Sequence, residues 1–104
     1  MTEPFPAESV YRVGQGVSAP MVIQKADPEY SEDARIGKLS GTVLLSIVID
    51  PNGVARDISL TRSLGFGLDE KALTAVAQWH FKPGMMNGQS VAVRAQIEIN
   101  FRLL

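Results

Sequence analysis

The sequence predicts one α+β domain, an antiparallel sheet of three to four strands with two helices packed on one face. Residues 91–103 carry an apolar side chain at every second position, with mostly polar side chains between them, which indicates a long strand with one buried face. An Asp-Pro-Asn-Gly turn at residues 50–53 joins two further strand-like runs, and residues 68–79 carry apolar side chains at helical spacing. The 104 residues, 45% hydrophobic and 20% charged, suffice for a single core.

The first 20 residues carry three of the six prolines and no regular apolar pattern, so we expect a flexible linker or tail at residues 1–20. The folded domain then occupies residues 21–104. It begins with a short strand at residues 21–25, which ends before Asp27 because Pro28 disfavours helical geometry at the residue before it.

A first helix is expected at residues 32–39, where Ser31 is a suitable N-cap. Acidic side chains in its first turn and basic ones near its end complement the helix dipole. Strands are expected at residues 42–50 and 54–62, on either side of the turn, so that they form an antiparallel hairpin.

The second helix is expected at residues 68–79, and its apolar side chains lie on one stripe: Leu68, Ala72, Ala75, Val76 and Trp79. A polar loop then leads to the long final strand. Because the hairpin already occupies one side of strand 42–50, the final strand must take the other side and become an edge.

An edge strand presents unpaired backbone N–H and C=O groups that accept an extended peptide by strand addition. The polar side chains of this strand protect it against aggregation without blocking such backbone pairing. Two structural alternatives stay open from the pattern alone: the strand simply completes the sheet, or residues 21–25 cover part of its edge.

The composition disfavours several other functions. A net charge of −1 with no Lys/Arg cluster argues against nucleic-acid binding. The chain has no cysteine and one histidine, His80, which we interpret as a capping or packing residue. We therefore predict no catalytic residue, no metal site and no cofactor.

Four motifs carry a resemblance to a known family: Asp27-Pro28-Glu29-Tyr30-Ser31, Gly41-Thr42-Val43, the 50–53 turn, and Trp79-His80-Phe81-Lys82-Pro83-Gly84. In this order and spacing, residues 20–104 resemble the TonB C-terminal domain family. The Trp79–Gly84 stretch is the most specific match. The chain departs from the family at Ser31, where the family's Tyr-Pro pair has proline.

The resemblance implies a periplasmic domain of an energy transducer that an N-terminal helix anchors in the inner membrane. Such a domain binds the TonB box of outer-membrane transporters and passes on proton-motive energy from the ExbB–ExbD complex for nutrient uptake, siderophores included. We expect the anchor and the ExbB–ExbD contacts to lie in an N-terminal region missing from this chain.

By the same resemblance, the box adds as a strand beside the final strand and contacts residues before the first helix. The edge residues are Val91, Ala92, Val93, Arg94, Ala95, Gln96, Ile97, Glu98, Ile99, Asn100, Phe101 and Arg102. The residues before the helix are Asp27, Pro28 and Tyr30. Two alternatives stay open: a regulatory module of the kind fused to sensor proteins, and a homodimerisation domain that pairs or exchanges strands.

Overall fold

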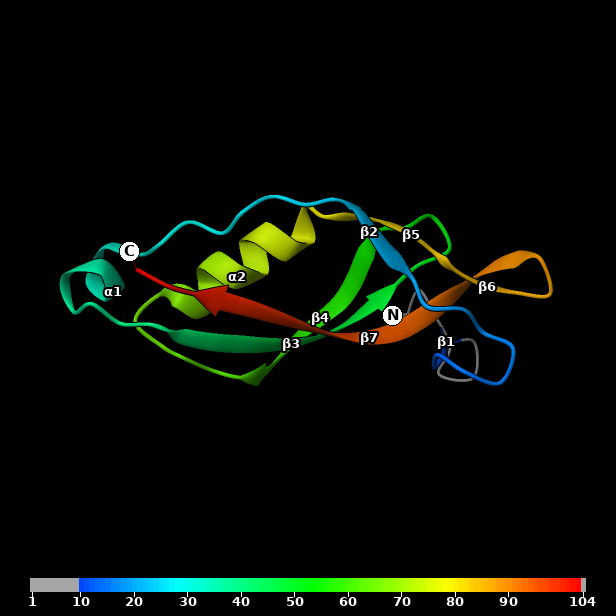
Figure 1. Cartoon of the computed structure of the whole chain (residues 1–104), viewed down its shortest axis with the longest axis horizontal. Helices are drawn as coiled ribbons and strands as arrows, with labels where there is room; N and C mark the ends of the chain where they lie inside the picture. The colour runs from blue at the N-terminus through cyan, green and yellow to red at the C-terminus, as the bar shows by residue number, and fades with distance from the viewer. Residues whose placement is uncertain (1–9, 104) are drawn as a thin grey trace, which may run out of the picture.

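The computed structural model describes residues 10–103, which form an elongated body of 49 × 31 × 20 Å (Figure 1). In chain order the elements are β1 (Val10–Tyr11), β2 (Met21–Gln24), α1 (Glu32–Ile36), β3 (Gly41–Ile49), β4 (Ala55–Arg62), α2 (Leu68–Ala77), β5 (His80–Lys82), β6 (Gly84–Met86) and β7 (Gln89–Phe101). At about 3.3 Å per residue the 13 residues of β7 extend over roughly 43 Å, so this one strand sets the length of the molecule.

The main sheet has the strand order β1-β7-β3-β4. The central strand β3 is antiparallel to both of its neighbours, and its register with β7 runs unbroken from Gly41↔Phe101 to Ile49↔Val93. The predicted hairpin and the predicted place of the final strand beside strand 42–50 are both present. This arrangement leaves β7 with β3 on one flank only.

The sheet is mixed and has more strands than expected, which corrects the prediction of a purely antiparallel sheet. β1 runs parallel to β7, and β6 forms a hairpin with the beginning of β7. The supposed polar loop contains the turn of that hairpin, where Asn87 and Gly88 both have positive φ, as a two-residue type I′ turn requires. A separate pair of strands, β2 and β5, completes the fold.

Residues 10–18 lie within the segment expected to be a linker, yet they are held against the body. Val17 is buried and bridges to Met86, and the amide of Ser18 donates to the Met85 carbonyl at 3.0 Å. The reason is a distant partner: Val10 and Tyr11 pair with Ala92 and Val93 of β7, which the proline content of the first 20 residues does not reveal. The expectation for residues 1–9 lies outside the described part of the chain.

The two helices are not equivalent. α2 lies along one face of the sheet, whereas the short α1 lies at one end of the molecule, beyond the start of β3 (Figure 1). Ser31 caps α1 as predicted, because its hydroxyl accepts from the amide of Ala34 at 3.2 Å. The expectation of two helices packed on one face is therefore met fully by α2 and in part by α1, whose Ala34 is buried in the same core. In residues 10–103, no helix has the length and apolar character needed to cross a bilayer.

The core lies between α2 and the covered face of β3 and β7. It is built from aliphatic and aromatic side chains that are almost fully buried, among them Val43, Leu45, Ile47, Leu68, Ala72, Val76, Ile99 and Phe101. Trp79, at the end of the α2 stripe, belongs to it as well. The long alternation of β7 thus provides one buried face, as the sequence indicated.

Two carboxylates fix the ends of the hairpin. Asp50 is buried and accepts from the amides of Asn52 and Val54, both at 2.9 Å, and so closes the turn. At the other end, Asp69 in the first turn of α2 holds the loop that follows β4. Burial raises the pKa of Asp69, but hydrogen bonds from the Ser63 hydroxyl and two loop amides outweigh this and hold the pKa below its usual value.

Candidate functional site

The candidate site is the outer flank of β7. Val93 pairs with Ile49 of β3 on one side and with Tyr11 of β1 on the other, so β1 lies on the flank that β3 leaves open. β1 pairs only with Ala92 and Val93. Within residues 10–103, no strand pairs with this flank at residues 94–101.

Residues 21–25 do not cover this edge. β2 pairs instead with β5, in the register Met21↔Lys82 and Val22↔Phe81, and all four of its residues are exposed. The structural alternative in which this segment covers β7 is therefore wrong. The outer flank of β7 stays open over most of its length.

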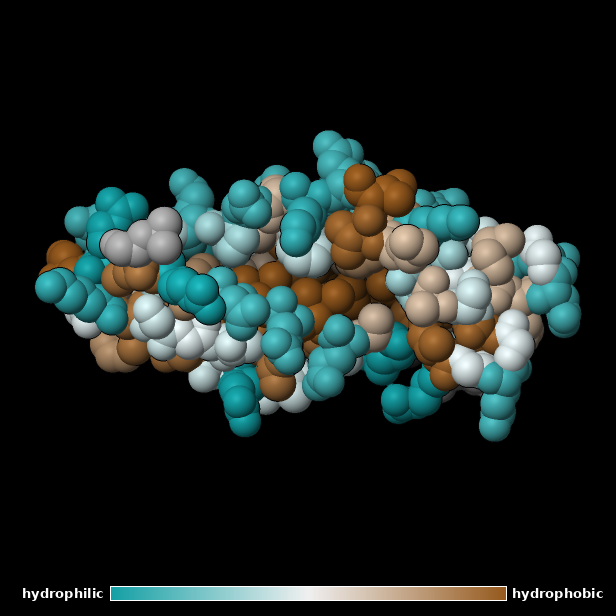
Figure 2. All heavy atoms as spheres, in the orientation of Figure 1, coloured by the Kyte–Doolittle hydropathy of each residue, from teal (hydrophilic) through white to brown (hydrophobic). Residues whose placement is uncertain are grey.

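The two faces of β7 differ along the open flank. On the face toward the core, Ala95 and Ile97 are only partly buried, between fully buried neighbours. On the opposite face, Gln96 and Glu98 are exposed. Figure 2 shows a hollow with a hydrophobic floor between β7 and the coil that follows β2, with hydrophilic side chains along its borders. A strand added to β7 would therefore lie over an apolar floor.

The coil that forms the other border is held in place by aromatic side chains. The indole N–H of Trp79 donates to the Ala26 carbonyl at 2.9 Å. The Tyr30 ring meets Phe101 edge to face at 5.5 Å between centroids, and its hydroxyl donates to the Leu39 carbonyl. The coil is thus fixed at Ala26 by Trp79 and at Tyr30 by Phe101 of β7.

The residues predicted before the first helix have unequal places. Tyr30 contacts the end of β7 through Phe101. Asp27 is exposed and Pro28 is half-buried, and neither makes a hydrogen bond or ion pair within residues 10–103. Of the three, Tyr30 has a defined aromatic contact with the predicted edge.

Polar side chains on the outer face of β7 are partly engaged inside the domain. Arg94 donates to the Ser46 hydroxyl at 3.0 Å and to the Asp57 carboxylate at 2.9 Å, across β3 and β4. Near the other end, the Thr42 hydroxyl donates to the Asn100 side-chain oxygen at 2.7 Å. Between Arg94 and Asn100, Gln96 and Glu98 are the exposed polar side chains that agree with the prediction of a solvent-facing polar face.

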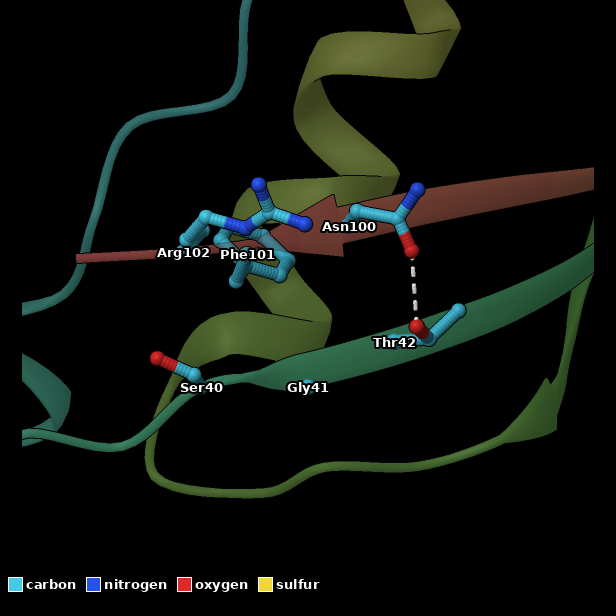
Figure 3. A pocket seen from close by; sticks show the side chains of 6 residues that line it. All are labelled: Ser40, Gly41, Thr42, Asn100, Phe101 and Arg102. Carbon is cyan, nitrogen blue, oxygen red and sulfur yellow. Dashed lines mark hydrogen bonds between the residues drawn. The ribbon is translucent and has the colours of Figure 1, made fainter. Parts of the chain in front are cut away.

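A shallow pocket lies where β7 ends and β3 begins (Figure 3). It is lined by Ser40, Gly41, Thr42, Asn100, Phe101 and Arg102, and the Thr42–Asn100 hydrogen bond spans it. The lining contains one cation and no carboxylate, imidazole or thiol. The pocket therefore extends the polar end of the β7 edge and offers no set of catalytic or metal-binding groups.

Sequence reasoning missed the contribution of β1 to this site. The signal was present in Val10-Tyr11, a β-branched and an aromatic residue side by side, which are frequent in strands. The predicted edge, residues 91–102, is not free of partners over its whole length. Its beginning pairs with β6 and β1, and β7 ends at Phe101.

Comparisons with known proteins agree with this architecture. Residues 26–103 match the family model described as Gram-negative bacterial TonB protein C-terminal. Among curated proteins, the chain is 37% identical over 84 residues to protein TonB of Vibrio cholerae, covering 80% of this chain and 34% of the relative. It is 32% identical over 77 residues to protein TonB of Xanthomonas campestris, covering 73% of this chain and 34% of the relative.

A solved structure shares the fold. The solution NMR structure of the Pseudomonas aeruginosa TonB CTD superposes with a TM-score of 0.66 at 23% identity, covering 86% of this chain and 89% of that one. The chain spans about a third of the length of the curated relatives it matches. Since the family model covers three quarters of the sequence, the chain belongs to the TonB C-terminal family.

Proposed function

We propose that this domain is the periplasmic part of a TonB-type energy transducer that binds the TonB box of outer-membrane transporters by strand addition to β7. The observation that carries the proposal is the open flank at residues 94–101 beside a hydrophobic hollow. Membership of the family supports the choice of partner. The role is binding and force transmission, without catalysis or a cofactor.

The backbone of the open flank supplies much of the affinity. Alternate residues of an edge strand direct both N–H and C=O outward, so residues 94–101 offer about eight hydrogen-bonding groups. At a net ~1 kcal/mol each they contribute roughly 8 kcal/mol, part of which offsets the ordering of the peptide. Backbone pairing alone therefore gives weak binding, and contacts with the hydrophobic floor must supply the rest.

The side chains of an added strand would alternate between two environments. One set would lie over the floor beside Ala95 and Ile97, which favours apolar residues. The other set would lie beside Gln96 and Glu98 and favours polar residues. The site is thus suited to an extended peptide with alternating character.

Strand addition also suits a protein that transmits force. When a peptide is pulled along the strand direction, its hydrogen bonds to β7 are loaded together and share the force. A complex of modest affinity then resists a brief pull. We expect the connection to the inner membrane and to ExbB–ExbD to run through an N-terminal region of the full-length transducer.

A proline scan of the partner peptide tests the proposal. Synthetic peptides from the N-terminal segment of an outer-membrane transporter of the same organism are titrated into ¹⁵N-labelled domain. We expect amide shifts at residues 94–101. In peptides that each carry one proline, binding should be lost at every second position, because only alternate peptide N–H groups face β7. Binding with shifts confined to other elements, or a scan without period two, would contradict strand addition at this edge.

The same flank can pair with a second copy of the domain, which is the competing use of the edge. Sedimentation across a range of concentrations separates the two. Dimerisation through β7 predicts that the peptide dissociates the dimer, whereas a dedicated peptide site predicts a monomer at all concentrations tested.

A further inference from the structure

β1 occupies the beginning of the flank on which the proposed function depends. Its two residues pair parallel to β7, Val10 with Ala92 and Tyr11 with Val93, and both are half-buried. Immediately beyond them along β7, residues 94–101 pair with β3 but lack a partner strand on this flank within the described residues 10–103. A guest strand on this flank that extends past Arg94 therefore meets β1.

The attachment of this segment to the body lies elsewhere, in residues 14–18. Gly14 and Val17 exchange backbone hydrogen bonds at 2.9 and 3.1 Å around a turn with positive φ at Gly14, Gln15 and Gly16. Ser18 then binds Met85 of β6 twice, through its amide and through its hydroxyl, both at 3.0 Å. We call residues 14–18 the clasp. It holds the segment through β6 and does not depend on the pairing of β1 with β7.

β1 itself is weakly held by comparison. It is two residues long, and parallel pairing is slightly less stable per residue than antiparallel pairing. Val17 in the clasp is 7% exposed, whereas Val10 and Tyr11 keep a substantial exposed surface. The release of β1 would leave the clasp and the rest of the sheet intact.

We propose that β1 is a displaceable internal strand that sets the register and length of the guest on β7. The inference rests on the proposed function. With β1 paired, the guest is confined to residues 94–101. A longer guest must displace Val10 and Tyr11 to reach Ala92 and Val93, while the clasp keeps β1 close enough to pair again when the guest leaves.

The effect of this competition on the affinity for a long guest follows from the fraction of molecules in which β1 is released. The apparent dissociation constant of a long guest is its intrinsic value divided by the fraction of molecules in which β1 is released. If β1 is paired about nine-tenths of the time, its removal strengthens binding of the long guest about tenfold. A guest that covers only residues 94–101 gains nothing.

The test compares two variants and two peptide lengths. Val10→Gly/Tyr11→Gly weakens β1, since glycine lowers strand propensity and removes both side chains. Arg12→Gly/Val13→Gly is the matched control, because both residues are exposed and lie between β1 and the clasp. The first probe is an eight-residue synthetic peptide from the transporter segment identified by the proline scan. Two longer peptides extend it by three residues, one at the N-terminal end and one at the C-terminal end.

We expect the β1 variant to bind one of the extended peptides several-fold more tightly than wild type does. The β1 variant and wild type should bind the eight-residue peptide with equal affinity. The control variant should bind every peptide as wild type does. Equal affinities for all three proteins at both lengths would overturn the role of β1. Hydrogen exchange without peptide gives a second readout: the variant should lose protection at Ala92 or Val93 and keep it at Met85. If no peptide shifts residues 94–101 in any variant, the proposed function itself fails.

Discussion

The central strand β3 lies between β4 and β7, and beyond the two residues of β1 both of these strands have an open outer flank within residues 10–103. Only one of the two is regular along its pairing with β3. β7 pairs with β3 in a single unbroken register over nine residue pairs. β4 pairs with β3 in a register that shifts twice, between Leu44 and Leu45 and between Ser46 and Val48. Asp57 lies at the second shift with φ of 49°, in the left-handed region.

The difference is one of backbone regularity, not of exposure. Most residues of β4 are exposed, Leu60 among them, so the strand is accessible. Bulges, however, twist and bend an edge so that a straight guest cannot pair along it. One edge is thus interrupted by bulges and the other is regular. Under the proposed function, this difference restricts strand addition to β7.

The largest expected effect comes from the strand between the two edges. Leu45 of β3 is fully buried and stands opposite Leu60 of β4 and Ile97 of β7. Leu45→Ala should lower the free energy of unfolding by about 2–5 kcal/mol, through lost transfer energy and the cavity left behind. Urea denaturation followed by circular dichroism measures it.

The same variant checks whether the edges depend on a common support. Hydrogen exchange should rise in β4 and β7 together, because both strands pair with β3. A rise confined to one strand would show that the two edges are supported separately.

The next effect concerns the end of β4 and depends on pH. The folded-state pKa of Asp69 is lowered, so its contribution to stability is complete above the ordinary aspartate value of about 3.9 and is lost as the pH falls through the folded value. Asp69→Asn should cost about 1–3 kcal/mol at pH 7, because the loop donors lose a charged acceptor.

The difference in the free energy of unfolding between wild type and Asp69→Asn should therefore become smaller as the pH falls. Urea unfolding at pH 7 and at successively lower pH values measures it, and Glu70→Gln is the matched control at an exposed position of the same helix turn. If this difference stays constant down to the lowest pH measured, the carboxylate charge of Asp69 does not contribute to stability.

A third effect separates the two edges in binding. Ile97→Glu places a charge beside the hydrophobic floor and should weaken peptide binding on the order of tenfold. Leu60→Glu is the matched control, an exposed aliphatic residue on β4. Isothermal titration with the same transporter peptide compares them. Equal losses for both variants would mean that the guest does not lie over the floor beside β7.

The sequence predicted the elements whose signals are local. The turn at residues 50–53, the stripe of α2 and the alternation of β7 each depend on neighbours within a few positions along the chain. The edge position of β7 followed from topology, since the hairpin could fill only one side of β3. These are the parts that define β7 and its place in the sheet.

The remaining strands depend on partners far along the chain. The four residues of β2 are exposed, and nothing in their pattern indicates that they pair with His80–Lys82 instead of β7. β1 is too short to show a period. The burial of Asp50, which is 3% exposed, is likewise not indicated by the turn sequence, because the amides and the Arg56 guanidinium that surround it come together only in the folded turn.

The smallest expected effect concerns the ion pair beside the β4 bulge. The Arg94 and Asp57 side chains are 33% and 67% exposed, so solvent screens their attraction. A double-mutant cycle with Arg94→Ala and Asp57→Ala should give a coupling of about 0.2–1 kcal/mol that falls with added salt. If β4 still resists strand addition in the double variant, the shifted register blunts this edge. If β4 then pairs with a second copy, seen as concentration-dependent sedimentation, the ion pair maintains the bulge and the two edges differ by one cross-strand contact.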